Sequence, residues 1–251
     1  MNNSMIRLKG RGYLIGNLSL LSLLFLSLCA FSVCVNILPE AITQLLSEHS
    51  VKTRAFAVAG VSLGVIVLMA FIFSLSYLGV QRFFLRQAER KGGKVKDIFF
   101  YFLPSESFQA FRFVCRYLLM KLLIYTVCYL PCLLGMGFML RLLKSTASLS
   151  ITLLMLFTVI LLFINGSVFA LSVRHSLFLV KYYYINGSCI SFGQLVANSQ
   201  IEMKKHRKSL LSLELSFVWW FLSCILVFPL VYVFLYYGQS KAVFAAEIMN
   251  E

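Results

Sequence analysis

Five long runs of the sequence carry almost no charged residues. They cover residues 12–38, 55–81, 122–140, 145–173 and 215–240. An α-helix needs ~20 apolar residues to cross ~30 Å of hydrocarbon, and each run meets or nearly meets that length. The pattern predicts an all-α, polytopic helical membrane protein.

The basic residues between these runs fall on alternate sides of the membrane. With the N-terminus inside, nineteen of the 23 Lys and Arg residues are cytoplasmic, and the others are Lys52, Arg54, Arg141 and Lys144. This orientation satisfies the positive-inside rule. It requires the last apolar stretch to turn back, with residues 209–228 crossing once and Pro229 in the first turn of a returning helix. We expect six transmembrane helices with both ends cytoplasmic; five, with the C-terminus outside, is the alternative.

The first apolar run has the basic flank of a signal peptide. A signal peptide, however, has a hydrophobic region of only ~7–15 residues followed by a small-x-small cleavage site. The run here covers residues 12–38 without a clean cleavage signal. We therefore expect a retained transmembrane helix.

Composition agrees with a single integral membrane domain over residues 1–251. The chain is 60% hydrophobic and 13% charged, with a mean hydropathy of +0.87, which excludes a soluble globule. The net charge of +14 could suggest nucleic acid, but the basic residues lie next to the apolar runs. That placement favours the anionic cytoplasmic leaflet of a cell membrane as the partner.

Two cytoplasmic segments carry further patterns. In residues 81–113, aromatic residues alternate with cations, as expected of a connector that lies at the membrane surface. In the second segment, Ser191 and Gln194 have the spacing of a helix capping box. An apolar helix face follows, formed by Phe192, Leu195, Val196, Ser199 and Met203.

The predicted helix of the second segment ends in a basic run. The run comprises Lys204, Lys205, His206, Arg207 and Lys208. Cations suit both a helix C-terminus and an anionic lipid surface. The segment is either an interfacial helix that guides the fifth span into the membrane or an element that docks a partner or senses lipid.

The C-terminal part of the chain resembles a known family. An ordered series of residues carries the likeness: Ser199, Met203-Lys204, His206-Arg207, Glu214-Leu215-Ser216-Phe217, Trp220, Tyr237, Ala242 and Phe244. It resembles the signature of domain-of-unknown-function family 975, which are bacterial integral membrane proteins. Asp97-Ile98-Phe99 after Gly92-Gly93 is similar to a connector of that family. The resemblance implies a multi-pass bacterial membrane protein, and it implies no reaction because the family's activity is uncharacterised.

The sequence departs from the family pattern in several places. Lys205, Trp219, Tyr236 and Ala245 stand where the family has other residues, and residues 171–184 lack its Ala-Pro-Tyr pattern. These departures affect a shared ligand site near the fourth span rather than the fold.

Glu214 is the one acid placed within a hydrophobic span. An ionisable group in that position is a functional-site hypothesis with a named partner. Lys121 enters the third span from the same side to a similar depth, so we expect a Glu214–Lys121 pair, with Arg116 as the fallback partner. Alternatively, Glu214 lies in the headgroup zone and contacts water.

No residue set in the sequence indicates a catalytic, cofactor or metal site. Nucleotide, zinc-protease and serine-hydrolase motifs are absent, and Asp97 is the only aspartate. Cys128 and Cys132 share a helix face without a His or carboxylate nearby to complete a metal set. We expect a protein that is not an enzyme and needs no cofactor.

Two functional hypotheses from different classes follow. The first is a non-catalytic module that binds anionic lipid or a membrane protein partner, a second copy of the chain included, through its basic cytoplasmic face. The second is a small transporter with Glu214, Lys121 and Asn165 near its pathway. Asn165, Gly166 and Ser167 lie within the fourth span, where small and polar residues favour close helix packing.

Overall fold

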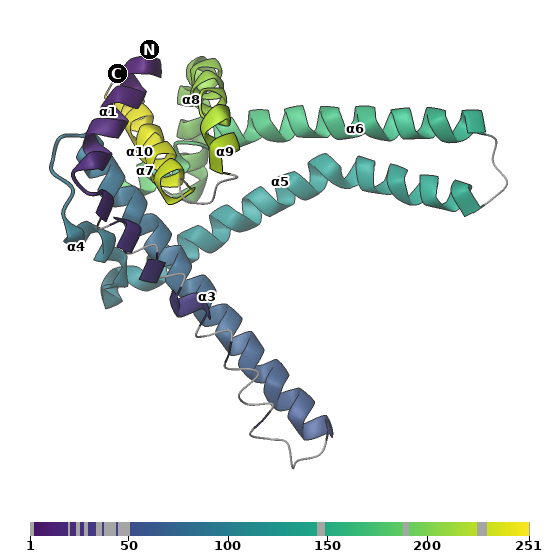
Figure 1. Ribbon diagram of the computed structural model, residues 1–251, viewed down its shortest axis with the longest axis horizontal. Coiled ribbons are helices and arrows are strands. Elements are labelled where there is room, and N and C mark those ends of the chain that lie inside the picture. Colours follow the sequence, from purple (N-terminus) through teal and green to yellow (C-terminus); the bar gives the residue numbers. More distant parts are fainter. Residues whose placement is uncertain are drawn as a thin grey trace. The chain divides into compact units, whose positions relative to one another are not determined.

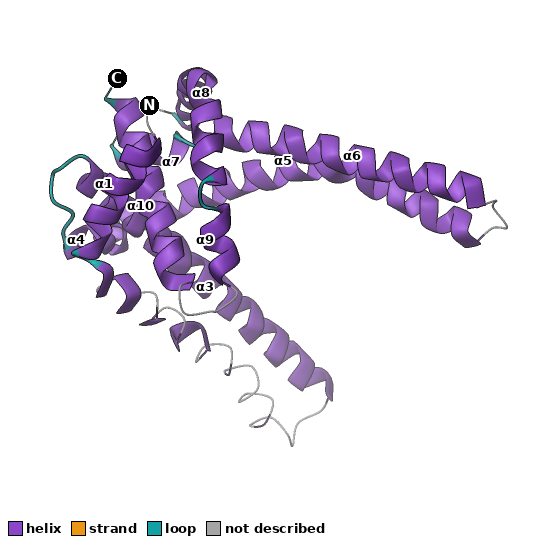
Figure 2. Cartoon of the chain, turned by 45° about the horizontal axis from the view of Figure 1, so that its top comes forward, coloured by secondary structure: helices purple, strands orange, loops and turns teal. Residues whose placement is uncertain are grey.

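The computed structural model describes most of the chain. The described residues are 3–19, 21–23, 26, 27, 30–33, 37, 44, 51–144, 149–187, 191–224 and 230–250. Every regular element in these ranges is helical (Figure 2), which confirms the all-α prediction for them. A third of the predicted first span (nine of residues 12–38), together with His49 and Pro229, lies outside the described residues.

The chain forms two compact units. Unit 1 comprises Met1–Phe111 and Ser212–Glu251, and unit 2 comprises Arg112–Leu211. The helices (Figure 1) are α1 (Asn3–Ile15), α3 (Val51–Ala88), α4 (Val95–Ile98), the 3-10 helix η1 (Phe100–Phe102), α5 (Pro104–Lys144), α6 (Leu149–Ser176), α7 (Val180–Ile185), α8 (Phe192–Leu215), α9 (Val218–Ser223) and α10 (Leu230–Met249). The start of α5 and the end of α8 belong to unit 1, and their remainders to unit 2.

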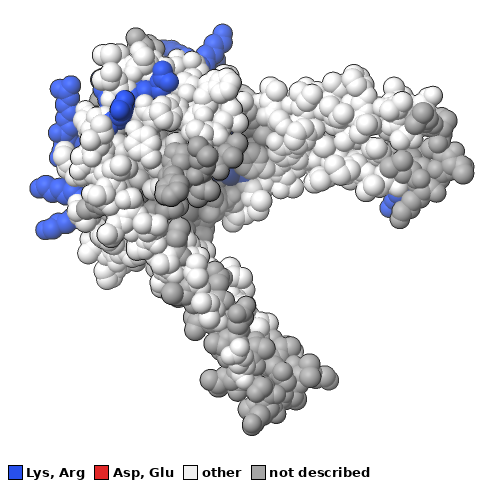
Figure 3. Space-filling model, viewed as in Figure 1, with Lys and Arg blue, Asp and Glu red and all other residues white. Residues whose placement is uncertain are grey.

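Three stretches of the described chain are long and apolar enough to cross a membrane. They are Val58–Ala88, Pro104–Arg141 and Ser150–Ile185. Many of their apolar side chains are exposed, as for Leu122, Leu134 and Leu154 at 64–66%. On the face shown in Figure 3, the α5–α6 hairpin presents almost no charged side chains. Apolar surface of this extent suits lipid rather than water, so these three stretches have the length and the apolar surface that membrane helices require.

Helices α5 and α6 pack closely where small residues face the neighbouring backbone. A Cβ atom added to Gly166 would lie 2.7 Å from the carbonyl oxygen of Cys128. The hydroxyls of Tyr129 and Ser167 lie 3.2 Å apart, and Asn165 donates its amide to Leu161 of its own helix (2.9 Å). The prediction that these residues mediate close helix packing is confirmed for Gly166 and Ser167, whereas the Asn165 side chain bonds within its own helix.

Unit 1 holds α1, α3 and α10 together, with α1 beside α10 (Figure 1). Gly10 of α1 packs against Ser240 of α10, and Gln239 donates to the carbonyl of Phe84 on α3 (3.3 Å). At the surface, Lys9 Nζ lies 2.7 Å from Glu247 Oε1. These contacts hold the first and last helices of the chain against each other.

Helix α8 confirms one sequence prediction and corrects another. The capping box is present: Ser191 N donates to Gln194 Oε1 (3.1 Å), and Gln194 N donates to Ser191 Oγ (3.4 Å). The expected helix end in the basic run at 204–208 is wrong, because α8 continues to Leu215. Leu210 and Leu213 extend the buried face of α8 beyond the lysines. Packing of these two side chains stabilises the helix past the basic run, where the charges suggested an end.

Candidate functional site

The outward face of α8 carries most of the predicted cationic contact residues. Of the predicted apolar face, Leu195, Ser199 and Met203 are buried, and Phe192 and Val196 are half-buried. Lys204, Lys205 and Lys208 are exposed, whereas His206 and Arg207 are half-buried. Arg207 Nη1 donates to Ser172 Oγ of α6 (3.3 Å). The surface open to a ligand is therefore formed by the three lysines, and Arg207 has a packing role within unit 2.

Ser199 links α8 to the turn between α6 and α7. Its hydroxyl donates to the carbonyl of Ser176 (2.8 Å) and accepts from the amide of Leu179 (3.2 Å). The side chain is fully buried. Backbone groups at helix ends need hydrogen-bond partners that the helix itself does not supply. The Ser199 hydroxyl is the partner of two such groups. The serine in the family-like series therefore has a structural role here.

Replacing Ser199 with Ala should lower the free energy of unfolding by ~1–3 kcal/mol, because it leaves a buried N–H and C=O without this partner. Thermal unfolding in detergent measures the effect. Ser209→Ala on the same helix is the matched control, since its hydroxyl has no hydrogen-bond partner among the described residues. Equal losses in the two variants would contradict the bridging role.

Glu214 lies in a compact ionic cluster at the end of α8. Its Oε1 atom is 2.6 Å from Lys241 Nζ and accepts a hydrogen bond from the Tyr237 hydroxyl (3.1 Å). Lys241 Nζ also lies 4.1 Å from the centre of the Tyr237 ring. The side chains of Glu214 and Lys241 are only 12% and 15% exposed. Glu214 is thus paired within unit 1 and does not rely on water alone.

The Glu214–Lys121 pair stays a prediction, because Lys121 and the fallback Arg116 belong to unit 2. Lys121 Nζ lies 4.2 Å from the centre of the Tyr117 ring in that unit. Sequence reasoning missed Lys241 as a partner. The signal was available, since Lys241 is the lone cation of the last helix and Tyr237 belongs to the family-like series.

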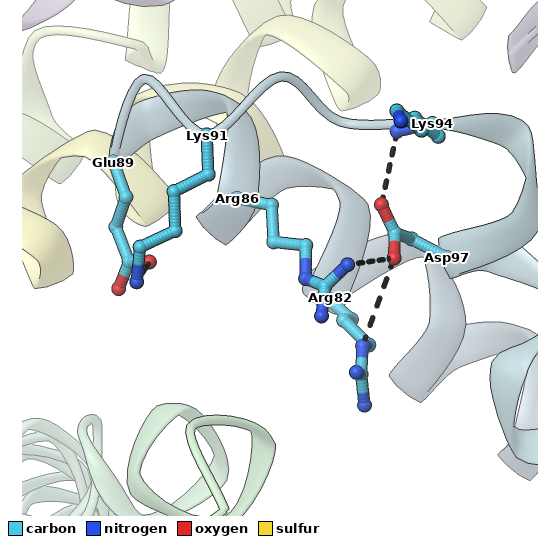
Figure 4. Close-up of polar contacts among 6 residues, drawn as sticks. All are labelled: Arg82, Arg86, Glu89, Lys91, Lys94 and Asp97. Carbon is cyan, nitrogen blue, oxygen red and sulfur yellow. Dashed lines mark hydrogen bonds and ion pairs between the residues drawn. The ribbon is translucent and has the colours of Figure 1, made fainter.

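A second ionic cluster surrounds Asp97, the only aspartate of the chain. Asp97 Oδ1 accepts from Arg86 Nη1 at 2.5 Å and lies 3.9 Å from Arg82 Nε. Asp97 Oδ2 accepts from the backbone N–H of Lys94 (2.9 Å). Figure 4 shows the three groups converging on the carboxylate from α3 and from the start of α4. Both carboxylate oxygens are engaged, so Asp97 fixes the connector to α3.

Aromatic contacts hold Arg82 in place within this cluster. Its guanidinium carbon lies 3.5 Å from the centre of the Phe100 ring, a distance that suits a cation–π contact. Burial raises the pKa of Tyr101, and a hydrogen bond from Arg82 together with its positive charge opposes that shift. The connector between α3 and α5 is therefore folded against α3.

A tight turn leads from α3 into this connector. Lys91 N donates to the carbonyl of Arg86 (3.0 Å), and Arg90 N donates to that of Gln87 (3.1 Å). Arg90 has φ 60° and Gly92 has φ 68°. These bonds match the motif that closes helix C-termini, in which the left-handed position normally holds Gly. Arg90 adopts this conformation despite its side chain.

Catalytic or metal chemistry gains no support from these arrangements. No three His, Cys, Asp or Glu side chains of the described residues gather closely enough to hold a metal ion. Asp97, Glu214 and Glu247 are each held by a cation. Cys132, buried on α5, faces the carbonyl of Val159 at 3.9 Å.

Comparisons with known proteins add no identification. No protein-family model matches the chain, and no match was found among curated proteins or solved structures. Function must be inferred from the chain's own residues and contacts.

Proposed function

We propose that the chain is a non-catalytic, multi-pass membrane protein that binds anionic lipid headgroups, or an acidic membrane partner, through its cytoplasmic basic face. The observation that carries this proposal is the two-sided character of α8. Its Leu195, Ser199 and Met203 side is buried, and Lys204, Lys205 and Lys208 are exposed. Each Lys near an anionic leaflet contributes ~1 kcal/mol of attraction.

Six spans with both chain ends in the cytoplasm form part of this proposal. Three further crossings would come from residues 12–38, 209–228 and the helix after Pro229. The packing of α1 against α10 and the Lys9–Glu247 ion pair support an even number of spans, because they bring the two ends of the chain together. The series from Ser199 to Phe244 supports a bacterial membrane protein similar to domain-of-unknown-function family 975.

A small transporter is the second candidate function. The Glu214–Lys241–Tyr237 cluster favours it most, since a shielded ionic group in a membrane protein is a common element of solute pathways. Asn165 lends it no support, because its amide is bonded to its own helix. We therefore place the binding function first.

The test is native mass spectrometry of the protein gently extracted from its own membrane. The combined variant Lys204→Gln, Lys205→Gln and Lys208→Gln should bind anionic lipid, or an acidic partner, on the order of a hundredfold more weakly than the unmodified chain. The matched control replaces the same three lysines with Arg, which keeps the charge and should keep the binding.

Equal retention by the Gln and unmodified proteins would overturn the proposal. A bound small solute that is lost in a Glu214→Gln variant would instead favour the transporter.

A further inference from the structure

We propose that the corner between α3 and α4 is a binding site for the phosphate of an anionic phospholipid. The corner is defined by Arg82, Arg86, Lys94 and Lys96 around Asp97. This inference shares with the proposed function only the requirement that the protein is embedded in a membrane. None of the α8 lysines takes part in the site. Its occupant is the headgroup phosphate of a lipid such as phosphatidylglycerol.

Asp97 orients two arginines without neutralising both. Arg86 uses one nitrogen to reach Asp97 at 2.5 Å, and its side chain remains 43% exposed. Arg82 is stacked on Phe100 with its side chain 14% exposed, and its Nε atom is buried without a hydrogen-bond partner among the described residues. Two guanidinium groups share one carboxylate, so one positive charge is left over. Guanidinium groups held in fixed positions are well suited to phosphate oxygens.

Two lysines add charge at the same corner. Lys94 and Lys96 are exposed, and neither makes an ion pair within the described residues. Lys91 differs, because its Nζ atom lies 2.8 Å from Glu89 Oε2 (Figure 4). The residues that define this corner are therefore four cations and one carboxylate. The excess charge favours an anionic ligand.

The neighbouring residues put these cations at headgroup depth. Only residues 89–103 separate α3 from α5, which both contain stretches able to cross a membrane. Within this short connector Val95, Phe99, Phe102 and Leu103 are 38–53% exposed. Exposed aromatic residues beside cations are typical of the membrane–water interface. A lipid phosphate is the anion present at that depth at high local concentration, so we assign it as the occupant.

The test uses the full-length protein in detergent, titrated with phosphatidylglycerol and followed by native mass spectrometry. Lys94→Gln with Lys96→Gln should weaken binding roughly thirtyfold, because two headgroup-level cations are lost. Neither side chain holds the fold, so the variant should unfold at the same temperature as the unmodified chain. Lys91→Gln is the matched control, since that lysine is already paired with Glu89, and should change binding little.

Further arms identify the ligand and separate the two sites. Phosphatidylcholine should bind weakly, and inorganic phosphate should not displace phosphatidylglycerol at equal concentration. The inference is overturned if the Lys94 and Lys96 variant binds like the unmodified chain, if Lys91→Gln weakens binding equally, or if either control ligand competes fully. If the α8 triple Gln variant still binds and the Lys94 and Lys96 variant does not, the corner is supported and the α8 site is refuted. If the Lys94 and Lys96 variant still binds and the α8 triple Gln variant does not, the corner is overturned.

Discussion

Replacing Gly79 with Ala should produce one of the two largest losses of stability in this protein. A Cβ atom at this position would lie 1.9 Å from the carbonyl oxygen of Ile98 and 2.8 Å from its carbonyl carbon. Both are backbone atoms, so no side-chain rotation can relieve the overlap. The connector would have to move away from α3, which would pull Asp97 from Arg86 and expose Ile98, now 1% exposed.

We expect Gly79→Ala to lower the free energy of unfolding by at least ~2–3 kcal/mol, the upper range for overpacked sites. The melting temperature in detergent is the measurement. Gly64→Ala is a matched control on the same helix, because a Cβ atom there meets nothing within 4 Å. Ala favours a helix over Gly by up to ~1 kcal/mol, so the control should be neutral or stabilising. A neutral Gly79→Ala would show that α4 does not pack on α3 in this way.

The hydrophobic pattern was sufficient to predict much of the architecture. The apolar runs at 55–81, 122–140 and 145–173 coincide with the three stretches able to cross a membrane. The capping box at Ser191 also followed from sequence, because its partner is only three residues away. The end of α8 did not, since a basic run suits a helix C-terminus whether or not tertiary burial continues the helix. Leu210 and Leu213 decided that outcome.

The ionic clusters were beyond local sequence rules for a different reason. Arg86 and Asp97 are separated by eleven positions and a tight turn, a spacing that no helix periodicity brings together. Glu214 and Lys241 lie on different helices, α8 and α10, so the choice between Lys121 and Lys241 depended on tertiary structure. Sequence identified Glu214 as an unusual acid but could not rank its partners. Likewise, the close approach of the Ile98 backbone to Gly79 could not be predicted from the sequence pattern.

Removing the Glu214 carboxylate should give the other large effect. Breaking a buried ion pair by removing one partner costs ~3–5 kcal/mol. Since Glu214 and Lys241 are still 12% and 15% exposed, we expect Glu214→Gln to cost ~2–3 kcal/mol of unfolding free energy, which is at or below the lower end of that range. Glu214→Leu should lower the melting temperature in the same direction. Glu202→Gln, at an exposed acid of the same helix, is the matched control and should change it little.

A double-mutant cycle identifies the partner of Glu214. If Lys241 holds the carboxylate, Lys241→Gln should cost much less in the Glu214→Gln background, with a coupling energy of ~1–3 kcal/mol. A parallel cycle with Lys121→Gln should then be additive within ~0.5 kcal/mol. Coupling to Lys121 alone would favour the sequence-based pair over the Lys241 contact. Additivity in both cycles would mean that Glu214 is held by water and Tyr237, and the stabilising role of the ion pair would have to be abandoned.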